Sequence, residues 1–579
     1  MRLERDLAVP MRDGTILYAD VYLPDGDGPF PALLERTPYN KESSSEISLG
    51  SPQVYSDHDY AVVIQDVRGR FKSGGEFYPF RDDGWGPNRD GYDTVEWMAA
   101  QSWCNGKVGT IGGSYSGVTQ YRLTPTRPPH LVAQFVRESS SDYHREWTYR
   151  GGALELGFSY HWALRVALSN LDHPELAARA ERFGGVAAVR ARLAGADREI
   201  HSWMRGRPHH PGSILSGLYD WWDDWLAHPS EDAYWWDTTI ALHHHEIDTP
   251  IWHLGGWFDG FLRGTLVNYE GVVARGMANA RPNQKLIVGP WIHGPGNINA
   301  STVGEIDFGP AAAVDIHALR LPWFDHWLKG VQNAIMDEPP VRIFTMGANE
   351  WQPLPSWPPP GVRPEEWYLH GGSSGSARSL NDGSLAPELP PVADSPDSYL
   401  YDPDDPVMAR GGGWLSYAGD PTGGYDQRPV EAGLLTYTSA PLRRDVEVTG
   451  WITARLFAMS SAPDTDFVVR LSDVAPDGLS RIVADGVLRA RYRDSLERPE
   501  PLTPNKVEEM EVDLWASSNL FRAGHRIRVA VTSSCWPRWD ANPNTGGPMH
   551  REARARVALN TIFHDAFRPS SIRLPIRPR

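Results

Sequence analysis

Residues 108–117 read V-G-T-I-G-G-S-Y-S-G, a β-rich run that passes through two glycines into a serine. The run predicts a strand, a sharp turn and a helix that stops before Pro125. A serine on such a turn has a strained backbone and needs small neighbours, and the turn exposes its hydroxyl above the sheet. Ser114 is therefore the candidate nucleophile. Gly112 fits the G-x-S-x-G pattern, but Gly117 comes one position late, so a purely structural turn stays an alternative.

The second serine of the run, Ser116, fits the same pattern less well. If it were the nucleophile, Ser114 and Val118 would occupy the two glycine positions. A serine hydroxyl is a weak nucleophile near neutral pH and needs a base, which in turn needs an orienting group. In α/β-hydrolases these follow in the chain order Ser, acid, His. Asp259 and His293 occur in this order, and each directly follows a predicted strand, where open α/β sheets build their sites.

Outward from the serine, short apolar runs alternate with helical or loop stretches. Residues 92–100 (YDTVEWMAA) have the apolar spacing of a helix. The predicted buried strands are 32–35, 61–64, 108–111, 251–254 and 286–288. This alternation predicts a doubly wound α/β sheet.

The rest of the chain predicts two further regions. Residues 141–240 contain Ala- and Arg-rich helical sequence and a tryptophan cluster, and we interpret them as a helical cap inserted into the α/β core of 1–140 and 241–352. A proline-rich stretch that begins at residue 353 continues neither a helix nor a central sheet, and it marks a boundary. The alternating apolar pattern within 353–579 predicts an antiparallel β-sandwich.

Composition limits the classes of function. The 579 residues carry 56 Lys and Arg against 73 Asp and Glu, a formal charge of −17, which disfavours nucleic-acid and anionic membrane partners. The two cysteines, Cys104 and Cys535, are too few for a disulfide framework or a zinc site, and we expect packed thiols. The start of the chain lacks a secretory pattern, so a cytoplasmic location is expected. The 24 Trp, 22 Tyr and 17 Phe suggest a substrate with an apolar or aromatic part.

Several motifs resemble the cocaine-esterase (CocE/NonD) hydrolases, which are relatives of α-amino-acid ester hydrolases and X-Pro dipeptidyl peptidases. The similarity runs nearly end to end. The matching stretches are RTPY (36–39), QDVRGR (65–70), GGSYSGVTQ (112–120), GWFDGF (256–261), VGPW (288–291), DQRP (426–429), DTDF (464–467) and NPNTGG (542–547). The resemblance implies an α/β-hydrolase core, a helical cap and a C-terminal jelly-roll domain.

The resemblance also implies a set of catalytic roles. The elbow of this family is G-x-S-Y-x-G, so the late glycine is expected. By this resemblance, His293 takes the proton from Ser114 and later returns it to the leaving group, and Asp259 orients the imidazole. The oxyanion hole would be the hydroxyl of Tyr39 with the backbone N–H of Tyr115. A phenol suits this role because it donates one directed hydrogen bond and stays neutral at working pH.

An aromatic acyl pocket is a further implication of the resemblance. In the cocaine-cleaving relative, cap tryptophans and a phenylalanine hold a benzoyl group, and the matching positions here are Trp147, Trp162 and Phe261. Buried rings usually need no ligand, so a packed cap core is the alternative. Amino-ester hydrolases bind an ammonium with acidic residues shortly after the triad acid, whereas Asp259 is followed by G-F-L-R, which ends in the cation Arg263. We therefore expect ester cleavage of an apolar or aromatic acyl group.

Other functions stay open as alternatives. An amide-cleaving acylase uses the same acyl-transfer chemistry, and an α-amino-acid ester hydrolase or dipeptidyl peptidase is disfavoured only by the missing acidic pair. In another class, the sandwich would bind a carbohydrate or protein partner while the hydrolase core is inactive. The expected partner is a small-molecule substrate, and the oligomeric state stays open, including a homo-oligomer.

No cofactor or metal is expected. His243, His244 and His245 are consecutive, so they do not share one face and fall short of a four-ligand site. The run RGRFKSGG (68–75) lacks the spacing of a phosphate-binding loop, and we expect a solvated or substrate-access loop there.

Overall fold

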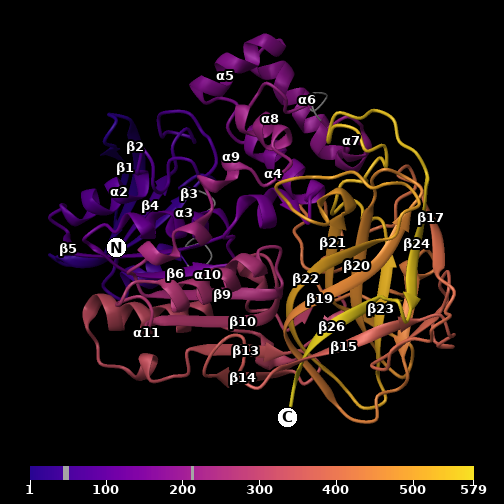
Figure 1. Cartoon of the computed structure of the whole chain (residues 1–579). Coiled ribbons are helices and arrows are strands. Elements are labelled where there is room, and N and C mark those ends of the chain that lie inside the picture. The colour runs from indigo at the N-terminus through magenta and orange to yellow at the C-terminus, as the bar shows by residue number, and fades with distance from the viewer. Residues whose placement is uncertain (43–50, 210–213, 579) are drawn as a thin grey trace.

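The computed structural model describes residues 1–42, 51–209 and 214–578. It contains a large mixed sheet with helices on its faces, a helical segment inserted into it, and an all-β C-terminal region (Figure 1). The predicted fold class, α/β followed by all-β, is confirmed.

The N-terminal sheet has ten strands in the order β1-β2-β4-β3-β5-β6-β9-β10-β13-β14. The strands from β4 through β13 in this order pair in parallel, and the two ends of the sheet are antiparallel. Every strand predicted from the sequence lies within one of them. Their bounds are β1 Arg2–Pro10, β2 Ile16–Leu23, β3 Phe30–Thr37, β4 Ala61–Asp66, β5 Cys104–Gly113, β6 Leu131–Arg137, β9 Ile251–Phe258, β10 Gln284–Ile292, β13 Val341–Thr345 and β14 Glu350–Leu354.

Helices cover both faces of this sheet, which explains why its central strands read as continuous apolar runs. All eight residues of β9 are buried, for example. The predicted helix at 92–100 is confirmed as α2. The core helices are α1 Ser51–Ser56, α2 Asp90–Ala99, α3 Tyr115–Leu123, α10 Leu262–Arg275 and α11 Ile316–Lys329.

The cap is inserted between β6 and β9, and it stands above the junction of the two sheet regions (Figure 1). It begins with a π-helical turn, η3, and its aromatic side chains form one core cluster with rings of the α/β region. Trp221, Trp222 and Trp225 of α8 are all buried in this cluster. The cap elements are η3 Tyr143–Thr148, β7 Tyr149–Arg150, β8 Ala153–Leu154, α4 Leu156–Leu168, α5 Pro174–Ala180, α6 Val186–Arg198, α7 Ile200–Arg205, α8 Asp220–Ala227 and α9 Ala233–Trp236.

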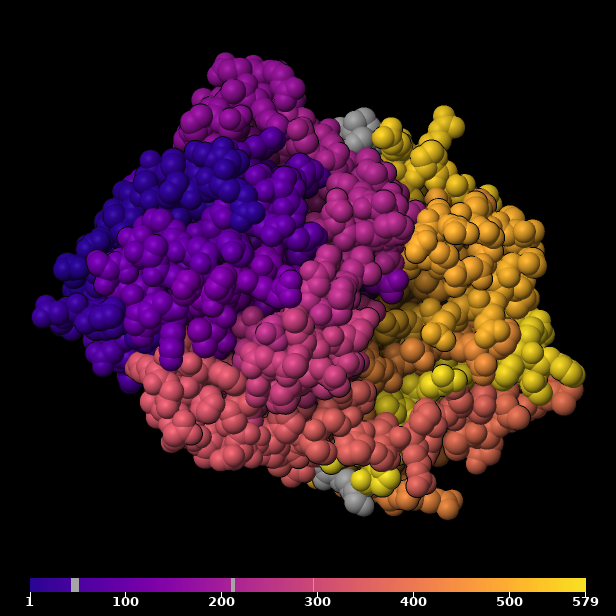
Figure 2. Space-filling view, turned by 60° about the vertical axis from the view of Figure 1, so that its left-hand side comes forward, coloured from indigo at the N-terminus to yellow at the C-terminus, as the bar shows by residue number. Residues whose placement is uncertain are grey.

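The C-terminal region is a set of mostly antiparallel strands that packs beside both the sheet and the cap. In Figure 2 the magenta cap residues lie between the violet α/β region and the orange C-terminal region. The switch between the two sheets occurs between β14 and β15, across the proline-rich stretch; the domain ranges themselves stay predictions. The strands are β15 Arg363–His370, β16 Gly383–Ala386, β17 Asp397–Tyr401, β18 Leu435–Ser439, β19 Val446–Ser460, β20 Asp466–Val474, β21 Ser480–Arg489, β22 Glu508–Phe521, β23 Arg526–Thr532, β24 Ala558–Asp565, β25 Arg568–Pro569 and β26 Ser571–Arg577.

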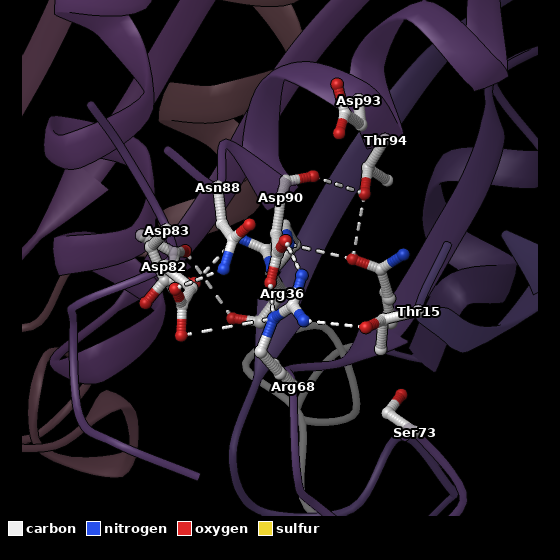
Figure 3. A network of polar contacts seen from close by, with 12 residues as sticks. Thr15, Arg36, Arg68, Ser73, Asp82, Asp83, Asn88, Asp90, Asp93 and Thr94 are labelled. Atoms are coloured by element: carbon white, nitrogen blue, oxygen red, sulfur yellow. Dashed lines mark hydrogen bonds and ion pairs between the residues drawn. The ribbon is translucent and has the colours of Figure 1, made fainter. Parts of the chain in front are cut away.

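The loop 68–75 corrects one expectation, because its arginines are not solvated. Arg68 is 8% exposed and donates two hydrogen bonds to Asp90 of α2, at 3.0 and 2.7 Å (Figure 3). It donates a third to Asp13 at 2.7 Å. Arg70 is fully buried and donates to the carbonyl oxygen of Pro38 at 2.8 Å. The sequence pattern could not show this, because the acceptors come from elements distant along the chain.

The two cysteines and the histidine run 243–245 can be placed in the fold. Cys104 and Cys535 are both free and buried, as expected. His244 Nε2 contacts Asn268 Oδ1 at 2.9 Å, and His243 Nδ1 contacts Glu246 Oε1 at 2.9 Å. Within 1–42, 51–209 and 214–578, no group of three or more His, Cys, Asp or Glu is arranged to hold a metal ion. Among the same residues, no helix has the length and apolar character needed to cross a bilayer.

Candidate active site

The turn between β5 and α3 has the strained geometry expected of a nucleophile elbow. Ser114 has φ 57° and ψ −125°, a conformation that non-glycine residues rarely adopt. A Cβ on Gly112 would lie 2.6 Å from the Ser116 Cβ, and one on Gly117 would lie 2.8 Å from the Ser139 Cβ. Both glycines are thus required by close approach, including the one that is displaced from the usual pattern.

The two serines of the elbow have different surroundings. Ser116 is 3% exposed, and its hydroxyl donates to Glu35 Oε1 of β3 at 3.4 Å. Ser114 is partly exposed. The accessible hydroxyl of this turn therefore belongs to Ser114, in agreement with the sequence pattern.

The predicted acid and base lie at the ends of neighbouring strands. Asp259 directly follows β9 and His293 directly follows β10, and the parallel pairing of these strands brings the two side chains together. His293 Nδ1 lies 2.8 Å from Asp259 Oδ1. Asp259 is fully buried, whereas the His293 side chain is 11% exposed. A carboxylate at Nδ1 sets the tautomer in which Nε2 can accept a proton.

The Tyr39 hydroxyl is held beside the elbow. Tyr39 follows the end of β3, and its oxygen accepts a hydrogen bond from Trp162 Nε1 at 3.0 Å. Since the indole can only donate, the phenol proton is left for another acceptor. Burial raises the pKa of Tyr39 to about 12, while hydrogen bonds with Trp162 and the Ser114 side chain lower it. The phenol thus stays protonated at neutral pH. Arg70 fixes the preceding residue through the Pro38 carbonyl.

The other predicted oxyanion donor belongs to the first residue of α3, Tyr115. The first backbone N–H groups of a helix have no intrahelical acceptor, so this position offers a donor directly beside Ser114. The Tyr115 ring is buried and packs edge-on against Tyr39, with centroids 6.5 Å apart. Its hydroxyl accepts a hydrogen bond from the Phe80 backbone N–H at 3.1 Å.

The three rings predicted to bind an acyl group lie together next to the histidine. Phe261 stacks on Trp147 with centroids 4.7 Å apart and 7° between the planes. Trp147 also meets Trp162 edge-on at 5.4 Å. Phe261 in turn lies edge-on to His293 at 5.1 Å. These rings therefore form a continuous aromatic wall from the cap to the acid–base pair.

The C-terminal region also contributes to this wall, which the sequence did not predict. Leu415 and Trp536 belong to the same core cluster as the cap rings. A Cβ on Gly260, directly after the predicted acid, would lie 2.5 Å from Leu415 Cδ1. Tyr417 stacks near Phe158 of α4 at 6.4 Å. No local pattern could have revealed these contacts, because they join segments that lie far apart in the chain.

A buried carboxylate beside the histidine was also missed. Glu138 directly follows β6, and its Oε2 lies 3.7 Å from His293 Nδ1. The one available signal was its place at a strand end, which is the same criterion that identified Asp259.

Two known protein families match this chain, and together the matches cover most of it. Residues 13–295 match the family described as X-Pro dipeptidyl-peptidase (S15 family). Residues 333–573 match the family described as X-Pro dipeptidyl-peptidase C-terminal non-catalytic domain. The first match contains the elbow, the acid and the base, and the second contains the all-β region.

Individual relatives are similar over nearly their whole lengths. The chain is 37% identical over 585 residues to the cocaine esterase of Rhodococcus sp. (strain MB1 Bresler), covering 99% of this chain and 98% of that protein. Among solved structures, an α-amino acid ester hydrolase superposes with a TM-score of 0.82 at 26% identity, covering 99% and 97% of the two chains. An aminopeptidase from a marine sediment Thaumarchaeota archaeon superposes with a TM-score of 0.81 at 28% identity, covering 99% and 96%.

Proposed function

Because the chain belongs to the cocaine esterase family of serine hydrolases, we propose that it cleaves esters with an apolar or aromatic acyl group through an acyl-enzyme on Ser114. The protein is a carboxylic ester hydrolase.

The proposed reaction begins at the elbow. His293 Nε2 removes the proton from the Ser114 hydroxyl as its oxygen attacks the ester carbonyl carbon. Asp259, 2.8 Å from Nδ1, stabilises the imidazolium that results. The Tyr39 hydroxyl and the Tyr115 backbone N–H donate to the developing oxyanion.

The intermediate then collapses and the ester bond breaks. The imidazolium of His293 gives its proton to the leaving alkoxide, and the alcohol departs while the acyl group stays on Ser114. A water molecule, deprotonated by the same imidazole, attacks the acyl-enzyme, and the Ser114 oxygen leaves with the proton. This step releases the acid product and regenerates the free serine, and no cofactor takes part.

The aromatic wall beside His293 carries the assignment of the acyl group. Phe261 lies edge-on to the imidazole and is stacked on Trp147, so an acyl group bound at the acid–base pair would meet ring surfaces. A flat acyl ring placed against this wall would gain edge-to-face contacts in addition to burial of apolar area.

Charge near the acid disfavours an ammonium group on the substrate. Arg263 lies shortly after Asp259, and its guanidinium donates to Glu146 Oε1 at 2.8 Å. Glu146 is buried, and its Oε2 accepts from the backbone N–H of Ser141 at 2.6 Å. This carboxylate is already neutralised, so it is not available to bind an α-amino group.

Two measurements test the proposal. A fluorophosphonate probe should label the wild-type protein and the Ser116→Ala variant but not Ser114→Ala, which should lose esterase activity on the order of a millionfold. An active Ser114→Ala with an inactive Ser116→Ala would move the nucleophile to the other serine.

A matched substrate panel tests the acyl group. We expect kcat/KM for p-nitrophenyl benzoate to exceed that for the acetate, and Phe261→Leu to reduce this preference by roughly 10- to 100-fold. The amino-acid p-nitrophenyl esters and dipeptide anilides in the same panel represent the alternatives. If either ranked first, the apolar acyl assignment would be wrong.

A further inference from the structure

Glu138 occupies a central place among the strands that carry the proposed triad. It directly follows β6, which lies between β5, the strand of the nucleophile, and β9, the strand of the acid. Glu138 is fully buried and has φ 45°, a left-handed conformation that is costly for a residue with a long side chain. Its backbone N–H donates to the Leu254 carbonyl of β9 at 2.7 Å, which fixes this turn.

The carboxylate of Glu138 points at the base of the triad. Its Oε2 accepts a hydrogen bond from the Gly294 backbone N–H at 2.8 Å, one residue after the histidine. The same oxygen lies 3.7 Å from His293 Nδ1, while Asp259 Oδ1 lies 2.8 Å from that nitrogen. One imidazole nitrogen is thus faced by carboxylates from two different strands.

Three ionisable side chains surround Glu138, and they belong to three different strand ends. Arg137, its neighbour at the end of β6, forms an ion pair with it. Burial raises the pKa of Glu138 to about 7, Arg137 and His293 lower it, and Asp259 raises it. The neighbouring acid therefore makes the ionised Glu138 less favourable, whereas a charged imidazole makes it more favourable.

This arrangement favours the charge that develops during the reaction. Two buried carboxylates repel each other while the imidazole is neutral, and this repulsion is offset when the imidazole gains a proton. An interaction that is stronger in the transition state than in the ground state accelerates the reaction. Each carboxylate also has an oxygen that is not already used: neither Glu138 Oε1 nor Asp259 Oδ2 has a hydrogen-bond partner among the described residues.

We propose that Glu138 is a positioning residue of the catalytic site, which anchors the histidine loop through Gly294 and provides a second carboxylate for the His293 imidazolium. The inference rests on the proposed triad, because it acts through that histidine. Glu138 does not touch the reacting atoms and exchanges no proton with the substrate.

The primary test is Glu138→Gln, which keeps the shape of the side chain and can still accept from the Gly294 N–H but carries no charge. We expect kcat to fall about tenfold with KM unchanged within about twofold. The acidic limb of the kcat/KM profile should move to lower pH by about one unit, because the imidazolium loses one of its carboxylates. Glu155→Gln is the matched control: Glu155 is also buried, accepts from Trp539 Nε1 at 2.8 Å, and has its pKa raised by burial. It should leave the limb in place.

A double variant separates this role from a merely structural one. In Asp259→Ala, Glu138 is the carboxylate that remains near His293 Nδ1. Adding Glu138→Gln to this variant should therefore lower kcat by a factor at least about ten times larger than in the wild type. A purely structural contribution would give the same factor in both backgrounds. Equal factors together with an unmoved acidic limb would overturn the proposal.

A second substitution keeps the test valid if Glu138→Gln does not fold. Glu138→Asp retains the charge beside Arg137 but is one methylene shorter, so its carboxylate falls short of the Gly294 N–H. It should fold and still lower kcat; wild-type kcat with a wild-type pH profile would overturn the proposal. The two levels are distinguishable: an active Ser114→Ala would refute the triad, whereas an inactive Ser114→Ala with a fully active Glu138→Gln would refute only the role of Glu138.

Discussion

Two buried clusters of charge lie in the same α/β sheet region and differ in what balances their carboxylates. In the arginine network, defined by Arg36, Arg68, Asp83 and Asp90, every carboxylate meets a guanidinium (Figure 3). Asp90 accepts from Arg68 through both oxygens, and Asp83 accepts from Arg36 Nη1 at 2.7 Å. A guanidinium cannot lose its proton in a protein, so the positive charges of this network are fixed.

In the proposed catalytic cluster, defined by Ser114, Glu138, Asp259 and His293, both carboxylates face one imidazole, and only Glu138 also pairs with a guanidinium, that of Arg137. An imidazole can gain and lose a proton near neutral pH, so the charge of this cluster can change during a reaction. Burial of charge alone therefore does not identify a site. A cluster balanced only by arginine holds the fold together, whereas one that contains a histidine can perform acid–base chemistry.

The largest expected effect is a loss of activity without a loss of stability, at the acid of the catalytic cluster. Asp259→Asn preserves the shape of the side chain but favours the wrong tautomer of His293, so kcat should fall about 10⁴-fold. The free energy of unfolding, measured by denaturant titration, should change by only about 1 kcal/mol. A large loss of stability with kcat preserved would place Asp259 in the structural class.

The next largest effect is expected in the arginine network, where a substitution should lower stability and leave activity nearly unchanged. Arg68→Met leaves the buried Asp90 without its main cation, which should lower the free energy of unfolding by about 3 to 5 kcal/mol. The folded protein should keep kcat within a few-fold. Arg12→Met is the matched control at the rim: Arg12 pairs with Asp93 at 2.7 Å, but its side chain is 34% exposed, so the loss should stay below about 1 kcal/mol. Equal losses in the two variants would contradict the distinction between buried and exposed pairs.

The smallest of the three effects is expected at Tyr39, which lies between the arginine network and the catalytic cluster. It follows β3, which carries Arg36, and its hydroxyl lies beside Ser114. Tyr39→Phe should raise the activation barrier by about 2.7 to 4 kcal/mol if the phenol donates to the oxyanion, with a change in KM of less than about threefold. Steady-state kinetics on one p-nitrophenyl ester measure both quantities. Full activity would remove Tyr39 from the mechanism and leave the triad unaffected.

Local patterns predicted much of the fold. The runs at 61–64 and 251–254 lie in β4 and β9, because a parallel strand covered on both faces must be apolar along its whole length. The elbow glycines were readable for a similar reason, since only the smallest residue fits where the strand, turn and helix approach one another closely. The expected solvation of the loop 68–75 was wrong for its arginines, because charged residues normally indicate solvent and Asp90, the buried partner of Arg68, lies far away in the chain.

The sequence by itself determined the class of fold, the serine at the elbow, and the presence of an acid and a histidine after later strands. These depend on spacing within a few residues, which backbone geometry makes legible. Only the tertiary structure decided that Glu138 stands beside Asp259 at one imidazole nitrogen, and that a C-terminal loop with Leu415 packs against Gly260, directly after the acid. Such contacts depend on the order of strands in the sheet and on the packing of separate regions, and no local pattern of residues encodes either.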